Sequence, residues 1–64
     1  MANHLTPEEL SEATGIRRDE LVRMCLAEAV PIYHGKIDKT LFVRSMLAAG
    51  HPLNDQARAL IQPA

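Results

Sequence analysis

Residues 9–24 have the sequence ELSEATGIRRDELVRM, and this stretch predicts two short helices joined by a tight turn. The first helical run stops at Gly15, because glycine can adopt a positive φ that costs most other residues energy. Ile16 follows and is expected to point inward. The second run places Leu21 and Met24 on an inner face at a helical spacing. The stretch therefore predicts a helix-turn-helix whose second helix projects from the body.

The first helix is expected to span about residues 7–13. Thr6 can cap its first turn, Pro7 suits the first helical position, and Glu9 can be the capping-box partner of Thr6. Residues 1–5 are expected to form a flexible lead-in to this helix, although Leu5 is expected to pack.

The second helix is expected to span about residues 18–29, with Arg17 near its cap and Pro31 as its stop. Residues 30–37 then predict a short β-hairpin, because branched and aromatic residues flank a glycine-containing tip at residues 34–36.

Asp38 can cap a third helix over about residues 39–49, with Gly50 as its stop. A rival interpretation places residues 40–43 in the second strand of the hairpin, because these residues also favour strands. The expected inner face of the helix comprises Leu41, Phe42, Ser45, Met46 and Ala49.

Asn54 can cap a last short helix that reaches about Ile61, and residues 62–64 are expected to be a flexible end. The chain, residues 1–64, has the length of one domain, and a domain this small buries only about 60% of its unfolded surface. The expected fold class is mainly α, with about four short helices and one short β-hairpin.

Residues 5–16, LTPEELSEATGI, resemble the opening of MerR-like winged helix-turn-helix proteins, a group that includes phage excisionases and small prophage DNA-binding proteins. Residues 42–50, FVRSMLAAG, together with the later Leu53 and residues 60–61, look like the third and fourth helices of that family. The resemblance implies a small winged helix-turn-helix domain in which the hairpin is the wing.

The net charge of −1 argues against strong binding to nucleic acid, but the charges are unevenly distributed. Residues 1–16 carry three glutamates and no lysine or arginine. Residues 17–44 carry six basic and four acidic residues, a net charge of +2. The basic side of the molecule is therefore expected on the second helix and the hairpin that follows it.

Arginines on the second helix are the strongest functional candidates, since they lie at its N-terminal end and on roughly one outer side. In a helix-turn-helix this region faces the major groove, where arginine can contact guanine or hold a phosphate. The alternative is a solvated helix face whose arginines form ion pairs with Asp19 and Glu20. The predicted DNA-contacting residues of this helix are Arg17, Arg18, Val22 and Arg23.

Four residues of the hairpin region are expected to contact the minor groove or phosphates: Tyr33, His34, Lys36 and Lys39. Alternatively, Tyr33 is a half-buried ring that covers an edge of the core, while His34 and Lys36 form a polar turn. Arg44 could be structural and lie against the acidic first helix.

No metal or other cofactor is expected, because His4, Cys25, His34 and His51 contain no closely spaced ligand pair. Cys25 is expected in the core, and a lone cysteine suits a reducing, cytoplasmic location. No apolar run is long enough to span a bilayer. Catalytic activity is not expected, since the sequence contains no recognised catalytic motif.

Two functions remain open at this point. The first is a small phage- or plasmid-type protein that binds double-stranded DNA, as a transcription regulator or a recombination directionality factor. A monomer would bind weakly, so a homodimer or a cooperative array on DNA is expected. The second is a protein-interaction module on the same fold that modulates a host or phage protein without binding DNA.

Overall fold

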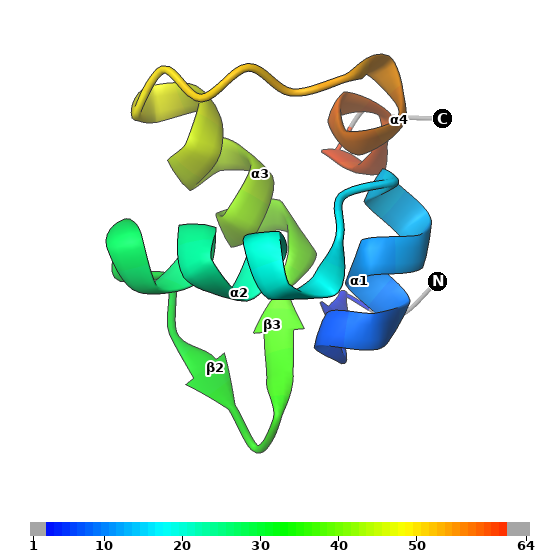
Figure 1. Cartoon of the computed structure of the whole chain (residues 1–64), viewed down its shortest axis with the longest axis vertical. Helices are drawn as coiled ribbons and strands as arrows, with labels where there is room; N and C mark the ends of the chain where they lie inside the picture. The colour runs from blue at the N-terminus through cyan, green and yellow to red at the C-terminus, as the bar shows by residue number, and fades with distance from the viewer. Residues whose placement is uncertain (1–2, 62–64) are drawn as a thin grey trace.

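Four α-helices and a small three-stranded antiparallel sheet enclose one apolar core in the computed structural model, which describes residues 3–61 (Figure 1). The prediction of a mainly helical domain with about four helices and a short hairpin is confirmed at this level. In chain order the elements are β1 (His4–Leu5), α1 (Pro7–Thr14), α2 (Arg18–Ala27), β2 (Ile32–Tyr33), β3 (Lys36–Asp38), α3 (Lys39–Ala48), α4 (Asp55–Arg58) and the short 3₁₀ helix η1 (Ala59–Ile61).

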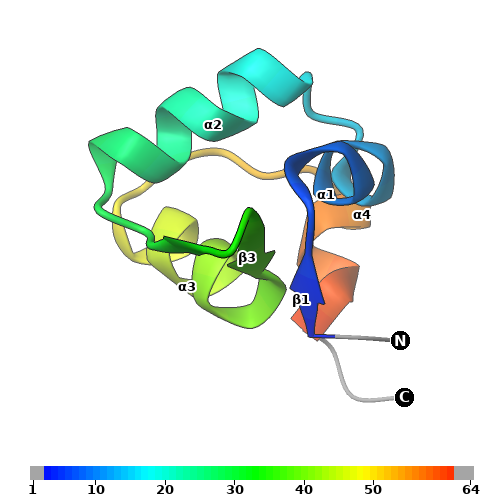
Figure 2. The same ribbon diagram turned by 90° about the horizontal axis from the view of Figure 1, so that it is seen from below.

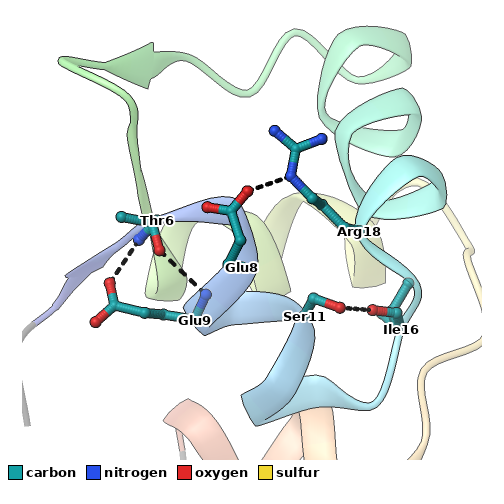
Figure 3. Close-up of polar contacts among 6 residues, drawn as sticks. All are labelled: Thr6, Glu8, Glu9, Ser11, Ile16 and Arg18. Carbon is teal, nitrogen blue, oxygen red and sulfur yellow. Dashed lines mark hydrogen bonds and ion pairs between the residues drawn. The ribbon is translucent and has the colours of Figure 1, made fainter.

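Helix α1 begins and ends at the predicted signals. The Glu9 N–H donates to Thr6 Oγ1 over 3.1 Å, and the Thr6 N–H donates to Glu9 Oε1 over 2.9 Å, which completes the capping box (Figure 3). The bond from the Thr6 N–H is the main reason that the pKa of the Glu9 carboxyl lies below its ordinary value. At the other end Gly15 has a φ of 75° and donates its N–H to Ser11 O over 2.8 Å.

Helix α2 ends at Ala27, two residues before the predicted boundary, and Pro31 is not its stop. Ala29 adopts a left-handed φ of 57°, and the Val30 N–H donates to Cys25 O over 2.8 Å. This pairing is the Schellman motif, in which the residue after the left-handed position packs inward. Val30 is buried, so its packing in the core ends the helix before the chain reaches Pro31.

The predicted hairpin is confirmed, with a tighter turn than expected. Its strands pair Tyr33 with Lys36 and Ile32 with Ile37, so the loop contains only two residues, and Lys36 already belongs to β3. The loop residues 34–35 have φ values of 50° and 74°, as a type I′ turn requires.

Strand β1 was not predicted, since residues 3–5 fall in the expected flexible lead-in. His4 pairs with Asp38 and Leu5 with Ile37, which places β1 beside β3 at the opposite edge from β2 (Figure 2). A two-residue strand has no periodicity that a sequence pattern could reveal. The other residues of the expected flexible ends, 1–2 and 62–64, lie outside the described residues.

Helix α3 follows β3 directly, so the rival assignment of residues 40–43 to a strand is wrong. Asp38 Oδ1 accepts from the N–H groups of Thr40 and Leu41 over 3.0 and 3.1 Å. The buried face consists of Phe42, Val43 and Met46. The predicted face was therefore wrong in part, because Val43 is buried whereas Leu41 and Ala49 are exposed.

The chain closes on the core through α4 and η1. Asn54 caps α4 as predicted, since its Oδ1 accepts from the Ala57 N–H over 2.7 Å. Leu60 and Ile61 are half-buried and pack against the core. Across residues 3–61, none of the helices is long and apolar enough to cross a membrane. The core residues are Leu5, Leu10, Leu21, Met24, Cys25, Val30, Ile37, Phe42, Val43, Met46, Leu53 and Ala57.

Candidate nucleic-acid interface

The turn between α1 and α2 is fixed by two hydroxyl groups. Thr14 is fully buried, and its Oγ1 donates to Leu10 O over 2.8 Å while accepting from the Ile16 N–H over 3.1 Å. The Ser11 hydroxyl donates to Ile16 O from the preceding turn of α1 (Figure 3). Both polar groups of the Ile16 backbone are thereby satisfied, so its side chain can pack against the core.

Helix α4 supports the same turn from a distant part of the sequence. Asn54 Nδ2 donates to Thr14 O over 3.0 Å, and Gln56 Nε2 donates to Glu12 O over 3.2 Å. A Cβ atom at Gly15 would lie 3.2 Å from Gln56 Oε1, so the position favours glycine for its φ and for space. Sequence analysis missed the role of Gln56, because its partner is 44 residues away. It also missed the role of Thr14, although both partners of this hydroxyl lie within four residues of it.

Helix α2 has one buried side and one exposed side. Leu21 and Cys25 are completely buried and Met24 nearly so, as the sequence predicts. On the opposite side Arg23 is exposed, and Leu26 is exposed to 73% of its surface. Sequence analysis overlooked Leu26, although its spacing of three residues from Arg23 places both on one face.

Each predicted arginine has a carboxylate partner. Arg17 lies 3.5 Å from Asp19, Arg23 lies 2.7 Å from Glu20, and Arg18 contacts Glu8 of α1 (Figure 3). The predicted ion pairs with Asp19 and Glu20 are therefore confirmed for Arg17 and Arg23, but not for Arg18. The contact with Arg18 holds the pKa of the Glu8 carboxyl below its ordinary value.

These ion pairs leave the arginines accessible. The side chains of Arg17, Arg18 and Arg23 are 85%, 58% and 71% exposed. Exposed pairs of this kind contribute about 0–1 kcal/mol, so a phosphate or a base can replace the carboxylate at little cost.

The three arginines do not share one side of α2, which corrects the expectation of a common outer face. A separation of five residues places Arg18 and Arg23 about 140° apart around the helix axis. Arg18 consequently lies toward α1, where it meets Glu8. Arg17 precedes the helix as its N-cap residue, and Val22 is half-buried. Arg23 is the arginine of the outer face.

The hairpin holds the second group of predicted residues and extends away from the helices (Figure 1). Tyr33 is 69% exposed, so the alternative of a half-buried ring is wrong. Its ring centroid lies 6.4 Å from that of His34, and its strand partner Lys36 is exposed. Lys39 is half-buried as the first residue of α3 and lies at the base of the hairpin, away from its tip.

An open pocket of about 210 Å³ lies beside the hairpin. The Asp38 carboxylate in its wall is occupied with capping α3, and its pKa is lowered chiefly by the Leu41 N–H. Of the predicted DNA-contacting residues, Tyr33 and Lys36 line this pocket. Its lining comprises His4, Pro31, Tyr33, Lys36, Asp38 and Leu41.

The remaining candidates do not form a further site. Arg44 on α3 is exposed and forms no ion pair with α1 among residues 3–61. Within the same range, no three histidine, cysteine or acidic side chains are close enough to hold a metal ion. Cys25 is a core residue, and burial raises the pKa of its thiol to about 11.

Comparisons of the chain with protein-family models, with curated proteins and with solved structures found no match. The functional assignment therefore depends on the geometry of α2 and the hairpin.

Proposed function

We propose that the chain is a small winged helix-turn-helix protein of the phage or plasmid type that binds double-stranded DNA. Helix α2 would enter the major groove, and the β2–β3 hairpin would act as a wing on the neighbouring backbone. The observation that carries the proposal is the exposed outer side of α2. Helix α2 follows a turn that is fixed by side chains from two helices, and the β2–β3 hairpin extends nearby.

The arginines supply the chemistry that such a helix needs. A guanidinium group donates two parallel hydrogen bonds to guanine O6 and N7, or to a phosphate. Arg23 is placed for a base contact, since it lies on the outer face. Arg17 and Arg18 lie at the start of α2, where a docked helix approaches the backbone.

The hairpin offers two complementary groups to the backbone. Lys36 is an exposed residue with a positive charge, and its strand partner Tyr33 presents an exposed ring and hydroxyl. Type I′ hairpins hold such side chains in a fixed relation, because both loop residues are confined to positive φ.

The charge balance limits the affinity that one copy can reach. Three arginines and two acids in residues 17–27 leave a local charge of +1, and α1 adds a negative region nearby. We expect about three phosphate contacts, hence a slope of log K against log salt near −3. Cooperative binding or a homodimer on repeated sites would raise the affinity.

The test is a selection from a pool of random duplexes of about 20 base pairs, followed by gel shifts on the enriched duplex. Arg23→Ala is expected to weaken binding about tenfold or more, and Arg18→Ala less, with unchanged melting temperatures. Arg44→Ala and Arg58→Ala remove the same charge from exposed positions on α3 and α4, and are expected to retain binding. Equal losses in all four variants, or no enriched duplex, would contradict the proposal.

A second candidate function is favoured by the pocket beside the hairpin. Tyr33 and Leu41 are 69% and 41% exposed there, and Pro31 adds a third apolar group. Such a surface suits a protein partner, as a module that modulates a host or phage protein would require. Capture of one protein that survives nuclease and high salt, and is lost in Tyr33→Ser, would favour this function over DNA binding.

A further inference from the structure

The outer face of α2 carries a stripe of chemically different side chains. Its members are Asp19, Val22, Arg23 and Leu26, at spacings of three and four residues that align them on one side of the helix. Leu26 is the most exposed large apolar side chain of the described residues at 73%, and Arg23 lies one turn before it.

Each of these side chains matches a base edge of the major groove. Arginine pairs with guanine, a carboxylate accepts from the cytosine amino group, and aliphatic side chains contact the thymine methyl group. The thymine methyl is the apolar group that the major groove presents. Two aliphatic members of the stripe therefore have a chemically defined target in DNA.

We infer that Leu26, supported by Val22, contacts a thymine methyl group and so determines part of the DNA sequence that α2 recognises. This inference rests on the proposed function. Leu26 follows Arg23 by three residues, so one base contacted by Arg23 and one contacted by Leu26 would lie close along the groove. The selected site would then contain a guanine within a few base pairs of the thymine.

The alternative is that Leu26 contacts an apolar patch on a partner protein. The surrounding groups favour DNA, because guanidinium groups occur at the start of the helix and within the stripe itself. Their carboxylate partners are exposed, so phosphates can replace them. A thymine contact also needs only one leucine, whereas the centre of a protein interface buries a larger apolar cluster.

The test uses the duplex enriched from the random pool and a series in which deoxyuridine replaces one thymine at a time. Deoxyuridine lacks only the methyl group, so the hydrogen-bonding edges of the base pair are unchanged. Binding of the unmodified protein is expected to fall about fourfold at one thymine, which corresponds to one buried methyl group. Leu26→Ala is expected to bind the two duplexes equally, while Leu47→Ala, an exposed leucine on α3, keeps the fourfold difference.

The outcomes separate the inference from the proposed function. If the protein enriches a duplex but is insensitive to every thymine methyl, the contact is overturned and DNA binding stands. A methyl dependence that persists in Leu26→Ala assigns the contact to another side chain and also overturns the inference. If no duplex is enriched and Leu26→Ala abolishes capture of a protein, the stripe is a protein-binding surface and both proposals fail.

Discussion

The inner and outer faces of α2 each carry a leucine, and the two leucines have opposite surroundings. Leu21 on the inner face is completely buried, whereas Leu26 on the outer face keeps 73% of its surface exposed. They are only five residues apart in one helix of ten residues. The inner leucine belongs to the core, whereas the outer one is not among the core residues of the part of the chain that the structure describes.

This difference separates stability from recognition within a single element. The inner face contributes buried apolar surface, which is the main driving force for folding. On the outer face, Arg23 forms an exposed ion pair of small energy with Glu20. Substitutions on the two faces should therefore change different measurements.

Replacing each leucine by alanine tests the comparison most strongly. Leu21→Ala is expected to destabilise the fold by about 2–5 kcal/mol, since it leaves a cavity in the core. Leu26→Ala, the same change on the outer face, is expected to alter the free energy of unfolding by less than about 0.5 kcal/mol. Urea unfolding measures both values, and equal losses would show that the outer face is buried in solution.

Thr14 helps to fix the turn before α2, because its hydroxyl donates to Leu10 O and accepts from the Ile16 N–H. Thr14→Val keeps the shape of the side chain but leaves the Ile16 N–H without its acceptor, at an expected cost of about 1–3 kcal/mol. Thr14→Ser keeps the hydroxyl and should retain more of the stability than valine does. If valine is as stable as threonine, the turn does not depend on this hydroxyl group.

Helices α2 and α3 both end in a Schellman motif, with alanine at the left-handed position in one and glycine in the other. Substitutions at this position change neither the inner nor the outer face of α2. Ala29 and Gly50 both have a left-handed φ, of 57° and 81°. Ala29→Gly should stabilise the protein by about 1 kcal/mol or less, because it removes backbone strain. Gly50→Ala should destabilise the protein by a similar amount, because alanine is strained at this positive φ. No atom would clash with the added Cβ, so backbone strain is the whole cost. Thermal melts that change in the same direction would refute this account.

A smaller effect is expected on acidification, and it arises away from α2. The pKa of Asp38 is lowered in the folded state, chiefly by the Leu41 N–H, so its stabilisation is complete above the ordinary carboxyl pKa. That stabilisation is lost as the pH falls through the lowered value. Asp38→Asn can still cap α3 but does not titrate, so the melting temperature of this variant should fall less between pH 7 and pH 3 than that of the unmodified protein. The two falls should differ by less than about 5 °C. An identical fall in both proteins would exclude Asp38 as the cause.

Local signals in the sequence were sufficient for most of the fold. The cap at Thr6, the glycine at residue 15 and the cap at Asp38 each depend on neighbours within a few residues, and all three are confirmed. The end of α2 was misplaced, because burial of Val30 outweighed the signal from Pro31.

The features that sequence analysis missed depend on distant partners. Strand β1 exists only because β3 lies beside it, and Gln56 supports a turn more than forty residues earlier. The pairing of Arg18 with Glu8 likewise requires the crossing of α1 and α2. Two local signals went unused. Leu26 stands at helical spacing from Arg23, and the hydroxyl of Thr14 has both of its partners within four residues.

The most direct measurement is a titration of the labelled protein with the enriched duplex, followed through its backbone amide resonances. The account predicts shifts concentrated in residues 17–27 and in the hairpin at residues 33–36, while the amides of α4 stay unchanged. Shifts confined to α1 or to the pocket wall around Leu41, or no shifts at all, would contradict the claim that the outer face of α2 binds DNA.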